Sequence, residues 1–284
     1  EPQTPAYLAS ICSEIVSNYD VDGIHLDYIR YPESSVRYTD AATFRKYGTR
    51  QSLREWRRNN VTECVREVHK AVKSLKPWVR LSCSPIGKFR DTDRTSSHGW
   101  NAYEIGAQDA QGWLREGIMD MLVPMMYFKG DQFYPFAFDW KQNSYGRIVV
   151  PGLASYLINQ KGWSAKTLTQ EVSVLRLSGF DGQTYFRTQH TLNNDGGFYD
   201  FLKKKTYTYR AFTPPLSWDC PHPPAAPFSP SLLSDSKGIM MTWKSDDMDS
   251  TLRYNVYASK NFPVDISDIR NIVAYKFHTT GIRR

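Results

Sequence analysis

The amino-acid sequence predicts an α/β fold with parallel strands, followed by a smaller all-β segment. Two observations carry this prediction. Up to about residue 212, short apolar runs alternate with stretches whose apolar residues recur at helical spacing. Beyond that point the composition changes to a proline-rich stretch and then to short alternating segments. Strands that alternate with helices indicate a parallel sheet with helices packed against it.

The first part contains five expected strands and several expected helices. The strands are expected at residues 21–26, 79–84, 119–127, 147–157 and 182–188. The helices are expected at residues 6–17, 51–75, 165–177 and 197–205, with a partly helical stretch at 101–116. The longest helix carries Val61, Val65, Val68 and Val72 on one face, and Pro77 ends it.

Five strand-helix units fit two architectures. In the first, an initial helix and about the last five units of a (β/α)8 barrel of the TIM type are present, which means that the barrel's first three strands are absent. In the second, five parallel strands form an open, doubly wound sheet. The periodicity of the apolar residues leaves both open.

Composition excludes several function classes. The chain has 284 residues, of which 40% are hydrophobic, so it can bury a sizeable core. The net charge is +7, but basic residues are interleaved with acids, as in Arg54, Glu55, Arg57 and Arg58. This pattern indicates a solvated helix face, and we expect no nucleic-acid partner.

The cysteines and the missing motifs point away from metals, cofactors and membranes. Cys12, Cys64, Cys83 and Cys220 lie far apart, with no CxxC pair and no metal-ligand spacing. No GxGxxG or GxxxxGK[ST] segment is present to cradle a phosphate. No apolar run approaches 18 residues, so we expect no transmembrane segment. We therefore expect neither a metal nor a cofactor.

The C-terminal part is expected to form a separate domain. Seven prolines between residues 213 and 230 predict a stiff linker. Alternating segments follow at 238–244, 252–259 and 272–278, and Trp243 with the Tyr-Asn-Val-Tyr run at 254–257 resembles the early strands of a fibronectin type III sandwich. We expect a barrel part at 1–215, a linker at 216–226 and a partial fibronectin type III-like domain at 227–284. A complete sandwich of this kind needs about 100 residues.

A carboxylate stands at the end of the first expected strand. Side chains alternate along a strand, so Gly23, His25 and Asp27 share one face and Ile24 and Leu26 share the other. Asp27 then lies at the carboxyl-terminal rim, where active sites of (β/α)8 barrels are found. A catalytic or substrate-binding role is expected for Asp27, and the alternative is a structural carboxylate that caps a loop or pairs with Arg30.

Five blocks of the sequence, in order, resemble the glycosyl hydrolase-like 10 family. They are VDGIHLDYIRYPE from residue 21, EWRRNNV from 55, LSCSPIGKFRD from 81, WLREGIMDMLVPMMYF from 113 and PGLASY from 151. The resemblance spans residues 2–218 and implies a TIM-type barrel in which Asp27, at the end of barrel strand four, is a catalytic carboxylate. It also implies action on bacterial glycan strands, including peptidoglycan.

The sequence departs from the family pattern at strand six. Members usually carry Pro-Gln-hydrophobic-Tyr-Trp, whereas this chain has PMMYF at residues 124–128. The amide and the indole are two expected sugar contacts, so a different substrate preference is implied.

The second catalytic carboxylate has no clear candidate in the sequence. Glycoside hydrolysis generally uses two carboxyl groups, about 5–5.5 Å apart for retention or about 6.5–9.5 Å apart for inversion. Strand five ends in Ser-Cys-Ser-Pro, without an acid. The remaining acids on later loops are better interpreted as solvated charges: Glu33, Asp91, Asp93, Glu104, Asp131 and Asp139. The partner is therefore expected in the missing N-terminal part.

Other residues are candidates for binding the substrate or supporting the site. His25, one layer below Asp27, and Ser84 are expected to support the site rather than to transfer protons. The substrate-binding candidates are Arg30, Tyr31, Arg57, Asn60, Trp100, Tyr127 and Tyr156. The alternatives are surface ion pairs for the arginines and core packing for the aromatic rings.

Together these observations predict an exported bacterial glycoside hydrolase acting on a cell-wall or other complex glycan. The export signal is not part of this chain, which begins with Glu1. The alternative is a non-catalytic carbohydrate-binding protein on the same scaffold. A five-strand sector would expose strand edges and an apolar lumen. We therefore expect an N-terminal fragment, a second copy or rearranged helices to fill the gap, and the chain alone to be inactive.

Overall fold

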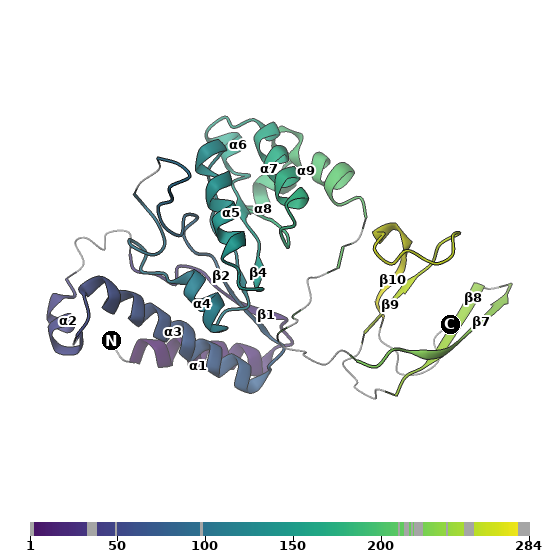
Figure 1. Cartoon of the computed structure of the whole chain (residues 1–284), viewed down its shortest axis with the longest axis horizontal. Coiled ribbons are helices and arrows are strands. Elements are labelled where there is room, and N and C mark those ends of the chain that lie inside the picture. The colour runs from purple at the N-terminus through teal and green to yellow at the C-terminus, as the bar shows by residue number, and fades with distance from the viewer. Residues whose placement is uncertain are drawn as a thin grey trace. The chain divides into compact units, whose positions relative to one another are not determined.

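A computed structural model describes most of the chain as two compact units, Glu1–Phe201 and Leu202–Arg284 (Figure 1). The described residues are 3–32, 39–48, 50–96, 99–209, 211–212, 216, 218, 224–236, 238–246 and 253–277. Most of the expected linker, with Cys220, lies outside these residues. The finer division at residues 215 and 226 stays a prediction.

A parallel sheet forms the centre of the first unit. Strands β1 (Gly23–Leu26), β2 (Arg80–Cys83), β3 (Met121–Leu122) and β4 (Ile148–Val149) pair in that order, all parallel. Strands β5 (Gly152–Leu153) and β6 (Thr184–Tyr185) form a second parallel pair. The prediction of an α/β fold with a parallel sheet is confirmed.

The two sheets continue one another. Isolated parallel bridges join Ile86 to Met125 and Met125 to Gly152, so the row of strands runs on from β3 to β5. β4 and β5 both fall within the single strand expected at residues 147–157, and Pro151 separates them. Spatial order therefore follows chain order without a reversal among the described strands, whereas a doubly wound sheet reverses at a switch point.

Two long helices pack together in the first unit. Figure 1 shows α1 (Gln3–Asn18) beside α3 (Leu53–Leu75). The valines expected on one face of α3 are buried. Ser52 and Glu55 cap this helix reciprocally: the Glu55 N–H donates to Ser52 Oγ at 3.2 Å and the Ser52 N–H donates to Glu55 Oε2 at 2.8 Å. Such a capping box explains why the helix begins at residue 53.

The remaining helices lie between the strands or follow β6. They are α2 (Ala41–Tyr47), α4 (Ala110–Glu116), η2 (Gly130–Gln132), α5 (Tyr134–Gln142), α6 (Leu157–Gln160), α7 (Ala165–Leu177), α8 (Thr188–Leu192), η3 (Asp195–Gly197), α9 (Phe198–Phe201) and η4 (Leu202–Thr206). The stretch at 101–116, expected to be helical in part, has its helix at its end, from residue 110. Residues 100–108 instead form turns that contact the loop after β1.

A buried carboxylate joins the carboxyl-terminal end of α3 to the amino-terminal ends of β2 and β4. Asp120, which is 1% exposed, accepts a hydrogen bond from the Leu81 N–H of β2 at 2.8 Å. Its oxygens also pair with Lys73 of α3 at 2.8 Å and with Arg147 before β4 at 3.4 Å. Because a buried charge needs such partners, Asp120 fixes how α3, β2 and β4 meet.

The second unit contains small antiparallel sheets. One pairs β7 (Phe228–Asp235) with β8 (Gly238–Lys244), and the other pairs β9 (Tyr254–Tyr257) with β10 (Ile272–Phe277), which follows η5 (Ile269–Asn271). The rings of Trp243 and Tyr254 meet edge to face, with centroids 5.0 Å apart. The all-β character agrees with the sequence, and the fibronectin type III assignment stays a prediction.

Candidate active site

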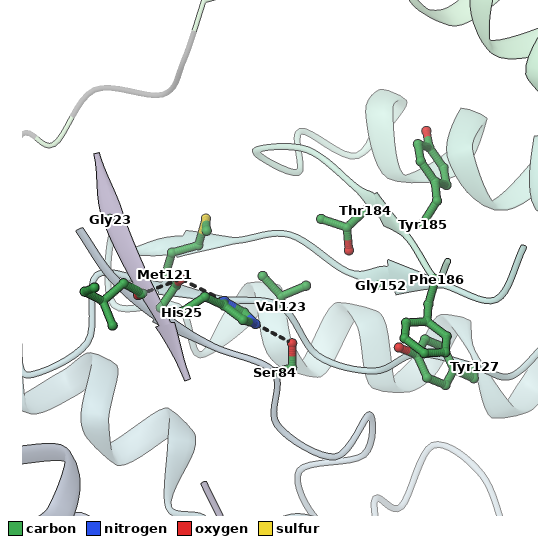
Figure 2. A pocket seen from close by; sticks show the side chains of 12 residues that line it. Gly23, His25, Ser84, Met121, Val123, Tyr127, Gly152, Thr184, Tyr185 and Phe186 are labelled. Carbon is green, nitrogen blue, oxygen red and sulfur yellow. Dashed lines mark hydrogen bonds between the residues drawn. The ribbon is translucent and has the colours of Figure 1, made fainter. Parts of the chain in front are cut away.

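A cavity of about 460 Å³ lies against one face of the parallel sheet (Figure 2). Its walls come from β1, β2, β3, β5, β6 and the ends of these strands. It is lined by Gly23, Ile24, His25, Ser82, Ser84, Met121, Val123, Tyr127, Gly152, Thr184, Tyr185 and Phe186. Of the candidate residues predicted from the sequence, His25, Ser84 and Tyr127 lie in this wall.

The alternation of β1 sets which side chains reach the cavity. Ile24 and Leu26 are buried, whereas Gly23, His25 and Asp27 are exposed. Asp27 follows directly after β1, and the Tyr28 N–H donates to its Oδ1 at 2.9 Å. The carboxylate therefore stands at the carboxyl-terminal end of the strand, as the alternation predicts.

The negative charge of Asp27 affects the pKa of a residue in the cavity wall. Burial raises the pKa of the Tyr127 phenol, with smaller contributions from neighbouring charges that include Asp27. Burial also raises the pKa of the Cys83 thiol, and Asp27 adds to this effect. Tyr127 thus stays a neutral hydrogen-bond donor near the carboxylate.

His25 is held by two serines of β2. Its Nδ1 lies 2.9 Å from Ser82 Oγ, and its Nε2 lies 2.8 Å from Ser84 Oγ, the contact drawn in Figure 2. The pairing register brings His25 opposite Ser82. Burial lowers the pKa of His25, and the negative charge of Asp27 partly offsets this. The imidazole is consequently neutral at pH 7.

The loop after β1 rests on the turns at residues 100–108. The guanidinium of Arg30 lies 4.8 Å from the ring centroid of Tyr28 and 5.1 Å from that of Trp100. Gln108 donates from Nε2 to the Ile29 carbonyl at 3.1 Å, and its Oε1 accepts from the Ile86 N–H at 3.1 Å. Arg30 and Trp100, predicted as separate candidates, are thus brought together. Gln108, which the sequence analysis missed, carries no motif that would reveal it.

Three other candidates form a neighbouring group around α3. Asn60 donates from Nδ2 to the Tyr31 hydroxyl at 3.3 Å. Arg57 lies over the Tyr31 ring at 5.4 Å and binds both carboxylate oxygens of Asp40, at 2.8 and 2.6 Å. This ion pair is largely buried. The structure therefore shows Arg57 engaged in an internal pair, and the group lines none of the cavity described above.

Aromatic rings form another wall of the cavity. Tyr127 stacks on Phe186 with centroids 5.5 Å apart, and Tyr156 meets both rings edge-on at 5.7 Å. Figure 2 shows Tyr127 and Phe186 side by side. Phe186 is 48% exposed, so its ring is accessible to a ligand. The sequence analysis missed Phe186, although its place at the end of an expected strand was a usable signal.

The candidate second acids lie elsewhere. Glu104 pairs with Arg54 and Arg58. Asp139 accepts a hydrogen bond from Gln111 at 2.9 Å, and burial raises the pKa of its carboxyl group. Among the described candidates, which also include Asp91, Asp93 and Asp131, none lines the cavity. Glu33 lies outside the described residues.

Comparison with known proteins places this chain in a family. The sequence model of the family described as glycosyl hydrolase-like 10 matches residues 1–166. The chain belongs to the glycosyl hydrolase-like 10 family. The matched region contains β1 to β5, Asp27 and the histidine–serine contacts, whereas β6 and Phe186 lie beyond it.

Two curated relatives are similar over different lengths. The chain is 25% identical to glycosyl hydrolase YngK of Bacillus subtilis over 276 residues, which is 90% of this chain and 54% of that protein. It is 35% identical to glycosyl hydrolase DigH of Escherichia coli over 133 residues, which is 45% of this chain and 30% of that protein. The chain thus spans about half the length of YngK and less than a third of the length of DigH.

A solved structure also resembles part of this glycosyl hydrolase-like 10 chain. It is bee venom hyaluronidase in complex with a hyaluronic acid tetramer, at 15% identity and a TM-score of 0.38, covering 70% of this chain and 61% of that one.

Two further findings concern the described residues alone. No described helix is long and apolar enough to cross a membrane, and no three described His, Cys, Asp or Glu side chains gather into a metal-binding group.

Proposed function

We propose that this protein hydrolyses glycosidic bonds of a bacterial cell-wall or other complex glycan, with Asp27 as nucleophile or as stabiliser of the oxocarbenium-like transition state. The observation that carries the proposal is the place of Asp27: a carboxylate at the carboxyl end of a parallel strand, beside a cavity with hydroxyl groups on one wall and aromatic rings on another. Sugars offer hydroxyls and apolar ring faces, which these walls match.

The sheet is proposed to be a sector of a (β/α)8 barrel. Its strands follow chain order, Gly23 and His25 line the cavity, and the alternation of buried and exposed residues puts Asp27 on their face, as expected of lumen residues of a barrel. Within the described residues β1 pairs only with β2, so its other edge can accept a further strand. We propose that another part of the full-length protein, or a second copy, completes the barrel and supplies the second carboxylate.

The Asp27→Asn variant of the full-length protein tests the proposal. Asparagine keeps the shape of the side chain but can neither attack an anomeric carbon nor stabilise positive charge there. Hydrolysis of bacterial cell-wall glycan, followed by chromatography of the released sugars, should fall at least about 100-fold. Asp22→Asn, the same change at the exposed amino-terminal side of β1, should leave it unaltered. Undiminished cleavage by Asp27→Asn would refute the assignment.

A carbohydrate-binding protein without catalysis is the second candidate function. It is favoured by the aromatic wall and by the absence of Asp and Glu from the described residues that line the cavity. In that case the full-length protein would bind glycan without releasing sugars, and Asp27→Asn would change affinity alone. For both functions we propose that the protein acts outside the cytoplasm, and fractionation of cells expressing the full-length protein tests this location.

A further inference from the structure

The contact of Ser82 with the Ile24 carbonyl gives a direction to the hydrogen bonds that run from Ile24 through His25 to Ser84. Ser82, a buried residue, lies with its Oγ 3.3 Å from the Ile24 carbonyl oxygen. A carbonyl oxygen only accepts hydrogen bonds, so the single hydroxyl proton of Ser82 is used there. With the Ser82 proton given to this carbonyl, the ring donates at the contact between His25 Nδ1 and Ser82 Oγ, and the imidazole proton lies on Nδ1.

The protonation of Nδ1 also sets which atom donates in the hydrogen bond between His25 and Ser84. A neutral imidazole has one N–H, so with Nδ1 protonated, Nε2 is an acceptor. Ser84 Oγ, 2.8 Å away, must donate its proton to Nε2. The oxygen of Ser84 is left with its lone pairs, and polarisation along the chain strengthens it as an acceptor. Ser84 lines the cavity, where these lone pairs can meet a ligand.

We infer that Ser84 is a specificity-determining residue that accepts a hydrogen bond from a hydroxyl group of a neutral pyranose in the cavity, with His25 and Ser82 as the positioning residues that fix its polarity. This inference rests on the proposed function, because it assumes that the cavity holds a sugar. Beyond the proposed function, the inference names the group of the sugar, a hydroxyl, that the cavity wall recognises.

The charges around the cavity favour a neutral sugar. Among the described residues that line it there is no lysine or arginine. The titratable groups near His25 are Asp27, directly after β1, and the cavity-lining Tyr127 and Tyr185, while Cys83 of β2 is buried. Among these described groups the one formal charge is negative, so an anionic sugar would be repelled. The same charge disfavours an oxyanion and therefore a nucleophilic role for Ser84.

The side-chain nitrogens of the six histidines give a direct test of the direction. Long-range proton–nitrogen NMR spectra at pH 7.5, with the His25 signals assigned by their loss in His25→Asn, should show His25 in the Nδ1–H form. In Ser82→Ala the proton should move to Nε2, because the acceptor for Nδ1–H is gone and Ser84 can accept instead. An Nε2–H ring in the wild-type protein would overturn the inference.

Binding of defined trisaccharides tests the ligand. Calorimetry at pH 7.5 should show that chitotriose, which is neutral, binds more tightly than the trisaccharide of galacturonic acid, which is anionic. Ser84→Ala should weaken chitotriose binding about 10-fold, the cost of one hydrogen bond of about 1.4 kcal/mol. Ser173→Ala, an exposed serine of α7, should leave affinity unchanged.

The two tests separate this inference from the proposed hydrolysis. Unchanged affinity in Ser84→Ala, preference for the anionic trisaccharide, or no chitotriose binding by the wild-type protein would overturn it. Because neither measurement needs bond cleavage, a protein that binds as expected but releases no sugar would contradict hydrolysis and retain the role of Ser84.

Discussion

Arg30 is the residue that ties the loop after β1 to the rest of the site. Its guanidinium lies over the rings of Tyr28 and Trp100, and Tyr28, next to Asp27, has a φ of +54°. A left-handed backbone is unfavourable for a side chain of this size, so neighbouring contacts must hold it. The stacking of Arg30 is such a contact, and it sets the path of the chain just after the proposed catalytic carboxylate.

A double-mutant cycle measures this contact. Arg30→Ala and Trp100→Ala should each destabilise the first unit, and the double variant should lose less than the sum by about 0.5–1 kcal/mol, the range of an exposed cation–π pair. Urea denaturation monitored by circular dichroism gives the change in the free energy of unfolding for each of the three variants relative to the wild-type protein. Lys46 over Tyr47, at 4.8 Å on α2, is a matched pair distant in sequence from Asp27 and serves as the comparison. Strict additivity would show that Arg30 and Trp100 do not interact.

At this scale the sequence predicts the position of Asp27 but not its surroundings. Alternation along β1 is a local property, so it can be read from six residues. The stacking of Arg30 on Trp100 joins two loops far apart in the chain, and no periodicity reports such a contact. Arg57 illustrates the same limit, because its ion pair with Asp40 is set by how α2 and α3 meet.

Helix α7 carries a carboxyl group on its buried face. Glu171 is 1% exposed, and among the described residues neither of its oxygens has a hydrogen-bond partner. Burial raises the pKa of Glu171 to about 8, and its charge contributes to the raised pKa of Tyr134 on α5. The helix itself was predicted correctly from its apolar spacing, but that spacing cannot show that a glutamate takes one of the buried positions.

The raised pKa of Glu171 makes stability depend on pH. The folded state retains a proton that the unfolded chain releases near its ordinary pKa of 4.5. The free energy of unfolding should therefore fall as pH rises from about 4.5 to about 8, by at most about 1.4 kcal/mol per pH unit. Glu171→Gln should remove this slope and be more stable than the wild-type protein at pH 8.

Urea denaturation at pH 5, 6, 7 and 8 measures the slope. Glu67→Gln, on the exposed face of α3, is the control and should keep the wild-type dependence on pH. If Glu171→Gln showed the same pH slope as the wild-type protein, Glu171 would have to be ionised in the folded state.

The two units of the molecule differ in how many of their side chains are buried. The first unit contains large, fully buried side chains such as Trp113, Trp140 and Phe136. In the second unit no residue of β7 or β8 is buried, and β9 is at most partly so. Local opening is cheap where few apolar side chains pack together.

Hydrogen exchange should reveal this difference. Amide protons of β7 to β9 should exchange at least about 100-fold faster than those of β2 and α3, because their opening costs less free energy. Mass spectrometry of peptides from a time course at pH 7 gives both sets of rates in one experiment. Equal protection of the two units would mean that the strands of the second unit are covered in solution.

At the scale of the molecule, the sequence predicts the class of fold better than its details. All five expected strand segments of the first unit are present, because each is a local apolar run. The division of one segment into β4 and β5, and which part of the stretch at 101–116 is helical, depend on tertiary contacts. The strand β7 was not expected, since prolines near its start suggested a linker.

The ion-paired Asp120 has a consequence for how this chain can change through evolution. Lys73, Asp120 and Arg147 come from three separate segments, and loss of any one weakens the pairing of a buried charge, at up to about 3–5 kcal/mol. Each single substitution is therefore a barrier, whereas a joint replacement by apolar residues is not. In the descendants of an ancestral chain, we expect the three positions to be inherited together or exchanged together.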